Sequence, residues 1–371
     1  MLLFTPGPTP VPESVRVAMA TPTLHHRTPE FEAIFKEARE LLFELIPMDE
    51  VVMIASSGTG AMEASIINLC HNTLLNVNAG KFGERFGKIA KASGLGSVEI
   101  KHEWDTPASV DEVLEALKAN SDIDAVAIQV SESAGGLRHP VEDIAKAIKE
   151  YNKDIMVIAD GITAVGVEAI DTTHIDALIA GSQKALMLPP GLAIVGLSND
   201  AIAKIGDGKG YYLNLASEIK KQRQNTTAYT AATTLVIGVV AILKEIKAKG
   251  GLDKLYANTE RLANATRASL QALGLHIYPK SPAKSMTTID DINAKEIRDL
   301  LKSEYGVNVA GGQDHLKGKI FRINQMGLIE PYEMAWVVNS VELALAKLGR
   351  REYDATASRV FNEIYFNLKE A

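Results

Sequence analysis

Between residues 29 and 195, short apolar runs alternate with amphipathic stretches, and this alternation limits the possible folds more than any other feature of the chain. The short runs have the length of buried strands, whereas the longer stretches repeat their apolar residues with the helical period. Alternating strands and helices are typical of an α/β fold. The predicted strands are 51–55, 74–77, 98–102, 124–130, 155–159, 177–180 and 192–195, and the predicted helices are 29–45, 61–70, 83–93, 110–118 and 141–151.

The sequence changes character on both sides of this region. Residues 5–12 contain four prolines and a glycine, which favours an extended arm. After residue 225 come two long helices, 231–249 and 252–273, and then a mixture of strands and helices. With 371 residues the chain is long enough for two domains. We predict an extended N-terminal arm at 1–20, a large domain at 21–251 and a smaller α+β domain at 252–371.

Charge and cysteine content exclude several functional classes. The net charge of -7 and the pI near 5.7 argue against a nucleic-acid-binding surface. The single cysteine, Cys70, rules out an intrachain disulfide and fits a buried position in a reducing compartment. The N-terminus is too short and proline-rich for a signal peptide, and no apolar run could span a bilayer. We expect a cytoplasmic protein without membrane contact, and we predict no metal site.

Polar residues follow several of the predicted strands, where open α/β sheets bind their ligands. Ser57, Ser133, Asp160 and Lys184 each occupy such a place. The turn at 57–60, here called the phosphate turn, joins a strand to a helix, so that backbone N–H groups and the positive helix end converge there. It lacks the glycine pattern of dinucleotide sites and the Gly-Lys-Ser/Thr of nucleoside-triphosphate loops. A single phosphate suits it better.

Lys184 lies between two predicted core strands and has two interpretations. Such a lysine can extend its amine to the surface, or it can lose its proton in a dry site and act as a nucleophile. Asp160 can similarly cap a turn or pair with a buried cationic ring nitrogen. One cofactor needs an anion site, a carboxylate for its ring nitrogen and a lysine for its aldehyde, namely pyridoxal 5'-phosphate. Lys184 would then bind the cofactor covalently and shuttle the α-proton.

Five segments also carry a family resemblance. They are FTPGPTPVP at 4–12, LHHRTPEF at 24–31, SGTGAME at 57–63, DGITAVG at 160–166 and GSQKALMLPPG at 181–191. The chain resembles the class V pyridoxal-phosphate aminotransferases over nearly its whole length, in particular the alanine–glyoxylate and serine–pyruvate group. The resemblance implies a fold-type I transferase with a mostly parallel seven-stranded sheet in its large domain. It also implies a homodimer with active sites at the subunit interface.

The resemblance assigns roles to individual residues. Lys184 matches the Schiff-base lysine and Asp160 the partner of the pyridine nitrogen. Phe82 occupies the position where the family stacks an aromatic residue on the cofactor ring. Tyr229 and Thr230 resemble a pair that reaches the phosphate of the other subunit. The remaining residues matched to cofactor contacts are Ser57, Gly58, Thr59, Ser133, Ile162 and Gln183.

Arg322 matches the residue that binds the α-carboxylate of the substrate. A planar guanidinium can hold a carboxylate through two parallel hydrogen bonds, although without the motif a surface arginine would be the simpler interpretation. Gly7 is expected near the same end of the substrate. His25 and His26 are expected to be structural, because Lys184 already supplies the proton chemistry.

The predicted reaction moves an amino group from a small amino acid, such as alanine or serine, to glyoxylate or pyruvate by a ping-pong mechanism. An aspartate-using enzyme is an alternative. A cysteine desulfurase or selenocysteine lyase fits less well, because Gln183 stands where those enzymes favour histidine and Cys70 lies too early in the chain. A pyridoxal-binding regulatory domain would need a DNA-binding module, which the sequence lacks.

Overall fold

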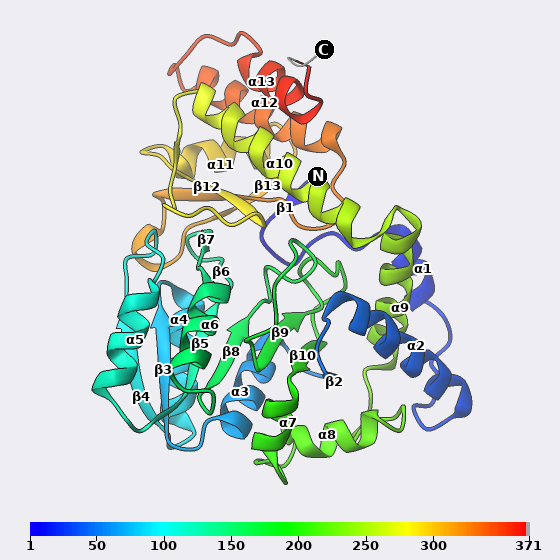
Figure 1. Ribbon diagram of the computed structural model, residues 1–371. Helices are drawn as coiled ribbons and strands as arrows, with labels where there is room; N and C mark the ends of the chain where they lie inside the picture. Colours follow the sequence, from blue (N-terminus) through cyan, green and yellow to red (C-terminus); the bar gives the residue numbers. More distant parts are fainter. Residues whose placement is uncertain (369–371) are drawn as a thin grey trace.

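The computed structural model describes residues 1–368 and contains a seven-stranded sheet in its larger part (Figure 1). Strand β10 is antiparallel to both of its neighbours, and the remaining neighbours pair in parallel. The predicted α/β fold with a mostly parallel sheet of seven strands is therefore confirmed. In spatial order the strands are β2 (Glu50–Ile54), β10 (Ala193–Leu197), β9 (Ala177–Gly181), β8 (Met156–Asp160), β5 (Ile123–Gln129), β3 (Thr73–Asn78) and β4 (Gly96–Lys101).

The apolar strands are explained by burial of the sheet on both faces. Successive side chains of a strand point to opposite faces, and in β2 Val51 and Met53 belong to one apolar cluster whereas Val52 and Ile54 belong to another. Helices cover both faces. The first cluster includes α2 (Pro29–Leu45), α5 (Val110–Ala119), α6 (Val141–Tyr151) and α9 (Thr233–Ala248), and the second includes α3 (Gly58–Leu69), α4 (Lys81–Ala92), α7 (Asn199–Ile205) and α8 (Leu215–Gln222).

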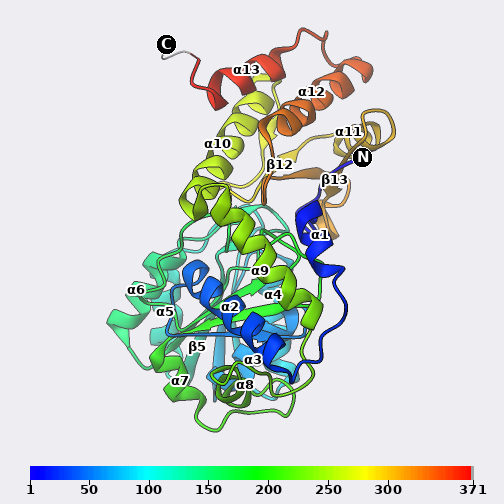
Figure 2. The same cartoon turned by 90° about the vertical axis from the view of Figure 1, so that its right-hand side faces the viewer.

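A second sheet of five strands forms the smaller part of the molecule, above the first in Figures 1 and 2. Four of its strands come from the C-terminal region, and the fifth comes from the N-terminus. The predicted division at residue 251 stays a prediction, and residues 369–371 of that domain lie outside the described part. The elements are β1 (Leu2–Phe4), β13 (Val307–Gly311), β14 (Ile320–Asn324), β12 (Met286–Asp290) and β11 (His276–Ile277), with helices α10 (Gly251–Ala272), α11 (Ala294–Ser303), α12 (Pro331–Lys347) and α13 (Thr356–Tyr365) and the 3-10 turn η1 (Asp314–Leu316).

The N-terminal arm is only partly extended. Strand β1 pairs in parallel with β13, and residues 5–12 continue without a helix. The prediction of an extended arm as far as residue 20 is wrong beyond Pro12, because α1 (Glu13–Met19) is a helix. This segment contains no proline, and the fully buried Val15 packs into the apolar cluster that α9 shares. Tertiary packing therefore gives the segment its structure.

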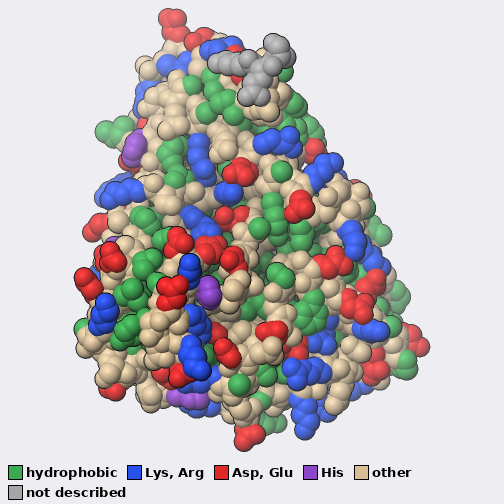
Figure 3. Space-filling view, viewed as in Figure 1, with side chains coloured by type: hydrophobic (Ala, Val, Ile, Leu, Met, Phe, Trp, Pro, Cys, Tyr) green, Lys and Arg blue, Asp and Glu red, His purple; other side chains and the backbone are tan. Residues whose placement is uncertain are grey.

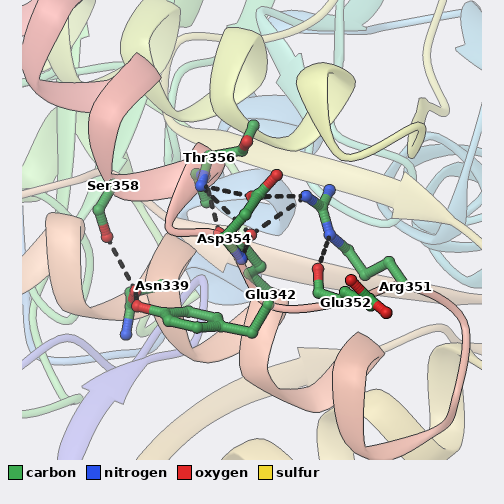
Figure 4. Close-up of polar contacts among 9 residues, drawn as sticks. Asn339, Glu342, Arg351, Glu352, Asp354, Thr356 and Ser358 are labelled. Carbon is green, nitrogen blue, oxygen red and sulfur yellow. Dashed lines mark hydrogen bonds and ion pairs between the residues drawn. The ribbon is translucent and has the colours of Figure 1, made fainter.

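Helix α13 was absent from the predicted elements and is held by a buried carboxylate (Figure 4). Glu342 of α12 accepts hydrogen bonds from the backbone N–H groups of Thr356 at 3.2 Å and Ala357 at 2.8 Å. Arg351 lies 3.2 Å from the same carboxylate and also pairs with Asp354. A carboxylate at a helix N-terminus is stabilised by the helix dipole. The contact that begins α13 thus comes from the preceding helix, α12.

The surface is mixed in charge. On the face in Figure 3, acidic and basic side chains are interspersed. Within residues 1–368, no helix is long and apolar enough to cross a membrane.

Candidate active site

Lys184 lies in a tightly bonded loop between β9 and β10. The hydroxyl of Ser182 donates a hydrogen bond to the carbonyl of Pro189 at 2.7 Å and accepts one from the N–H of Leu192 at 3.2 Å. The N–H of Leu188 donates to the carbonyl of Ser182 at 2.9 Å. These bonds close the loop on itself, so the backbone that carries the lysine has a fixed position relative to the sheet.

The N-terminal arm covers the lysine. The amine of Lys184 donates to the carbonyl of Pro6 at 2.5 Å, and the hydroxyl of Thr9 donates to the carbonyl of Lys184 at 2.6 Å. Gly7 has a φ of +110°, and a Cβ there would lie 2.5 Å from the lysine nitrogen. Glycine adopts this positive φ without strain and has no Cβ that would collide with the lysine nitrogen. Gly7, which we expected near the substrate, thus lies against Lys184.

Asp160 ends the strand next to β9 and is almost completely buried. Its Oδ1 accepts a hydrogen bond from the N–H of Ile162 at 2.9 Å. Burial raises the pKa of Asp160 to about 6, against the opposing effects of the Ile162 hydrogen bond and the charges of Lys184 and Arg85. Burial also lowers the pKa of Lys184 to about 8, which Asp160 opposes and Arg322 reinforces. At pH 7 about a tenth of Lys184 is therefore an uncharged amine, which is the nucleophilic form.

The phosphate turn leads directly into α3. Ser57 is the N-cap residue, but its side chain makes no capping hydrogen bond. A Cβ at Gly58 would lie 2.4 Å from Cδ1 of Ile162, so a larger residue here would require the Ile162 side chain to shift. The Oε1 atom of Gln183 is buried and has no hydrogen-bond partner within residues 1–368. An uncapped helix N-terminus and an unpaired buried polar atom both fit a site that binds a polar ligand.

Two residues of this region were missed by the sequence analysis. The carboxylate of Glu132 accepts hydrogen bonds from the N–H groups of Phe82 at 3.0 Å, Gly83 at 2.9 Å and Ala134 at 2.9 Å. Burial raises its pKa to about 7. Arg85 lies over the ring of Phe82, 4.7 Å from its centroid. Glu132 does lie in the polar segment that follows β5, but nothing in the sequence links it to Phe82.

Arg322 extends from β14 of the second sheet and bridges the two parts of the molecule. One Nη donates to the carbonyl of Ser133 at 2.5 Å, and the other Nη and the Nε donate to the carbonyl of Gly311 at 2.7 and 3.2 Å. A guanidinium has five N–H groups, so within the described residues one N–H on each terminal nitrogen takes no part in these bonds. Burial lowers the pKa of Arg322 to about 10, which leaves it charged at neutral pH.

These groups converge on one place. The charges of Asp160 and Arg322 both act on the pKa of Lys184, and Ile162 contacts the phosphate turn. The backbone carbonyl of Ser133 fixes Arg322. The structure therefore brings together most of the residues predicted for the site.

Tyr229 and Thr230 are not joined to this group by any hydrogen bond of the described chain. The ring of Tyr229 packs against Tyr212 at 5.1 Å and Tyr211 at 5.5 Å, and Thr230 is exposed. The hydroxyl of Tyr212 donates to the carbonyl of Ala55, just before the phosphate turn, at 3.1 Å. The three tyrosines, here called the tyrosine cluster, thus lie at the outer side of that turn.

The two histidines of the N-terminal region make local contacts. Nδ1 of His25 accepts a hydrogen bond from the N–H of Arg27 at 3.2 Å, and the rings of His25 and His26 lie 4.9 Å apart. The pKa of His26 is lowered, mainly by burial. The structural roles expected for both residues stay a prediction.

Comparison with known proteins identifies the family. The profile described as aminotransferase class-V matches residues 2–328. An uncharacterized aminotransferase of Helicobacter pylori is 53% identical over 369 residues, which cover 99% of this chain and 100% of the relative. A serine–glyoxylate aminotransferase of Hyphomicrobium methylovorum is 29% identical over 367 residues, covering 94% of this chain and 90% of the relative.

A solved structure agrees with the sequence matches. The aspartate aminotransferase of subgroup IV from Thermus thermophilus superposes with a TM-score of 0.87 at 32% identity, covering 94% of this chain and 99% of that chain. The predicted fold type I is confirmed by this likeness. The family profile spans most of the sequence, and the relatives match it nearly end to end. This chain therefore belongs to the class V aminotransferase family and is an aminotransferase.

Proposed function

We propose that the cofactor is pyridoxal 5'-phosphate and that Lys184 binds it covalently. The observation that carries this proposal is the convergence of a partly buried lysine, a buried carboxylate and a buried guanidinium at the strand ends. When bound, the cofactor supplies a ring that withdraws electrons from the substrate α-carbon. The residues that would hold it are Ser57, Gly58, Thr59, Phe82, Ser133, Asp160, Ile162, Gln183 and Lys184.

Lys184 is suited to moving a proton. Because its pKa is lowered to about 8, its amine can accept a proton at neutral pH and return it at a neighbouring atom. Asp160 is suited to pairing with a cationic ring nitrogen, since such a partner would stabilise its buried charge. The arm that contacts Lys184 through Pro6 and Gly7 limits the access of water on that side.

Arg322 is the proposed binding group for the substrate carboxylate. Its two remaining N–H groups, one on each terminal nitrogen, can meet two carboxylate oxygens in parallel. The bonds to Ser133 and Gly311 hold the guanidinium plane in place before the substrate arrives. An amino acid and a 2-oxo acid both carry this carboxylate, so one residue serves both halves of a ping-pong reaction.

Small substrates are the preferred assignment, with alanine or serine as donor and glyoxylate or pyruvate as acceptor. The relative named serine–glyoxylate aminotransferase supports this choice. Aspartate is the second candidate, because the Thermus structure at 32% identity is named an aspartate aminotransferase. Sulfur transfer is disfavoured, because Cys70 is fully buried and burial raises the pKa of its thiol to about 12.

We also propose a cytoplasmic homodimer in which Tyr229 and Thr230 complete the site of the other subunit. The tyrosine cluster supports an interface at this place, because Tyr211 is 84% exposed and Tyr212 is 43% exposed in the single chain. Large exposed aromatic side chains are enriched at protein interfaces.

The experiment is a matrix of amino donors against 2-oxo acids, with each half-reaction followed by the change in cofactor absorbance. We expect alanine or serine with glyoxylate or pyruvate to react fastest. Aspartate as the fastest donor would replace the small-substrate assignment by the second candidate. A protein that takes up no pyridoxal phosphate would contradict the proposed cofactor itself.

A further inference from the structure

Arg85 is a half-buried cation beside the candidate site for which the sequence suggested no role. It lies in the second turn of α4, and its Nη1 donates a hydrogen bond to Oγ1 of Thr59 in the phosphate turn at 2.9 Å. Its guanidinium also lies over the Phe82 ring. Within residues 1–368 no carboxylate forms an ion pair with Arg85, whereas the nearby Lys88 pairs with Glu84 at 2.8 Å. No ion pair of the described residues therefore neutralises its positive charge.

The contact with Thr59 determines what that hydroxyl can do. A threonine hydroxyl has one hydrogen to donate and two lone pairs to accept with. Arg85 can only donate, so Thr59 must act as the acceptor in this bond. Within the described residues, no hydrogen bond uses the hydroxyl hydrogen of Thr59. The hydrogen is left free to bind an external acceptor at the N-terminus of α3.

The charge of the phosphate turn also indicates a role for Arg85. A phosphate monoester carries a charge close to -2 at neutral pH, whereas residues 57–60 contain no cationic side chain. The N-terminus of α3 contributes only about half a positive charge. Arg85 lies close enough to affect the ionisation of Asp160 as well. Arg85 thus interacts both with Thr59 in the phosphate turn and with Asp160 at a strand end.

We propose that Arg85 is a positioning residue for the cofactor phosphate, which orients the Thr59 hydroxyl as a donor and adds positive charge to the phosphate turn. This inference rests on the proposed cofactor. The interaction through Thr59 acts on the phosphate group, so its effect depends on whether the ligand carries a phosphate. The contact of Arg85 with Phe82 and its charge near Asp160 would affect ligands with and without a phosphate alike.

The test compares the dissociation constants of pyridoxal phosphate and pyridoxal for wild type, Arg85→Met, Arg85→Lys and Thr59→Val by equilibrium dialysis. Lys88→Met is the matched control, because it removes an exposed cation of the same helix. We expect Arg85→Met to weaken pyridoxal phosphate by about 10- to 100-fold, as for a lost hydrogen bond to a charged group, and pyridoxal by less than about 3-fold. Arg85→Lys should give a smaller loss, and Lys88→Met should match wild type.

A double variant tests the route through Thr59. If Arg85 acts by orienting this hydroxyl, Arg85→Met together with Thr59→Val should weaken binding by clearly less than the product of the two single effects. Full additivity would overturn the proposed route. Equal losses for pyridoxal phosphate and pyridoxal would overturn the role at the phosphate.

Binding of inorganic phosphate gives a readout that needs neither the cofactor nor catalysis. Phosphate should raise the Tm of the wild-type apoprotein and raise that of a folded Arg85→Met or Arg85→Lys variant by less. An equal rise in wild type and variants would contradict the inference. A wild-type protein that binds no pyridoxal phosphate would contradict the proposed cofactor, whereas normal wild-type binding with unchanged Arg85 variants would remove only the role of Arg85.

Discussion

The region around Lys184 and the tyrosine cluster belong to one proposed site but differ in how the chain supports them. Asp160 is buried and Lys184 is partly buried at the ends of paired strands, and the N-terminal arm and Arg322 act on Lys184 within the same chain. The tyrosine cluster has Tyr211 84% exposed, and Thr230 is exposed beside it. A single chain therefore completes the first region, whereas the second has surfaces still open to a partner.

Folding of a single chain positions the groups around Lys184, whereas the surroundings of the tyrosine cluster would be completed only by assembly of the dimer. A buried charge must be balanced where it is buried, so the groups around Lys184 have to be present in the same folded unit. Exposed aromatic rings carry no such requirement. Variants of the Lys184 region should therefore affect each site from within, and variants near the tyrosine cluster should affect the neighbouring site.

The largest effect is expected from Lys184→Ala. Loss of the amine removes both covalent attachment and proton transfer, so kcat should fall by at least about 1000-fold. The measurement is turnover with the best substrate pair, with Lys88→Met as a control. Activity within tenfold of wild type would show that the buried region is not the catalytic one.

Arg322→Ala should weaken both halves of the reaction. Because the amino donor and the 2-oxo acid share a carboxylate, kcat/KM should fall by about 100-fold for each, mainly through KM. Arg322→Lys keeps the charge but not the two parallel donors and should recover only part of the loss. A loss confined to one of the two substrates would argue against a shared binding group.

The rate at which apoprotein binds pyridoxal phosphate should rise with pH. The reactive form of Lys184 is the neutral amine, and a pKa of about 8 means that lowering the pH from 8 to 6 reduces this form by about 50-fold. Asp160→Asn removes a charge that raises the lysine pKa, so the pH profile should shift to lower pH. Uptake measured by absorbance that is independent of pH between 6 and 9 would be inconsistent with this assignment.

Thr230→Ala should lower cofactor affinity by about tenfold, the effect of one hydrogen bond to a charged group. Mixed dimers decide which site is affected. When one subunit carries Lys184→Ala and the other Thr230→Ala, the only intact lysine lies in the second subunit. If Thr230 serves the partner, that site retains normal affinity. Weakened binding at that site would mean that Thr230 acts within its own chain. The tyrosine cluster would then not contribute to the site of the other subunit.

The smallest effect is expected at a helix cap in the large part of the molecule. Ser109 and Glu112 form a capping box at the start of α5, and the structure contains both of its hydrogen bonds. Ser109→Ala should lower the free energy of unfolding by about 1 kcal/mol and leave cofactor affinity unchanged. Denaturant titration and equilibrium dialysis measure the two quantities. A change in affinity would mean that general destabilisation contributes to the effects above.

Local patterns explain which parts were predictable. Lys184 and Asp160 follow strands whose apolar runs mark the sheet, and the end of a strand is a place that sequence identifies. The helix at Pro29–Leu45 was predicted with its full bounds because its apolar face repeats with helical period.

Contacts between separate segments explain why the roles of Arg85 and Glu132 and the helices α1 and α13 were not predicted. Arg85 of α4 reaches Thr59 at the start of α3 only because these two helices meet in space. Glu132 accepts from Phe82 because the segment after β5 meets the start of α4. Helix α13 begins at hydrogen bonds to Glu342, and α1 depends on the burial of Val15. Neither the sequence period nor the motifs carry this information.

The role proposed for Lys184 is tested most directly by locating the covalent attachment of the cofactor. Protein incubated with pyridoxal phosphate and reduced with borohydride is digested, and the peptides are analysed by mass spectrometry. We expect one phosphopyridoxyl group per chain on the peptide that contains Lys184, and none on the corresponding peptide of Lys184→Ala. Label spread over surface lysines, or absent from the Lys184 peptide, would contradict this role.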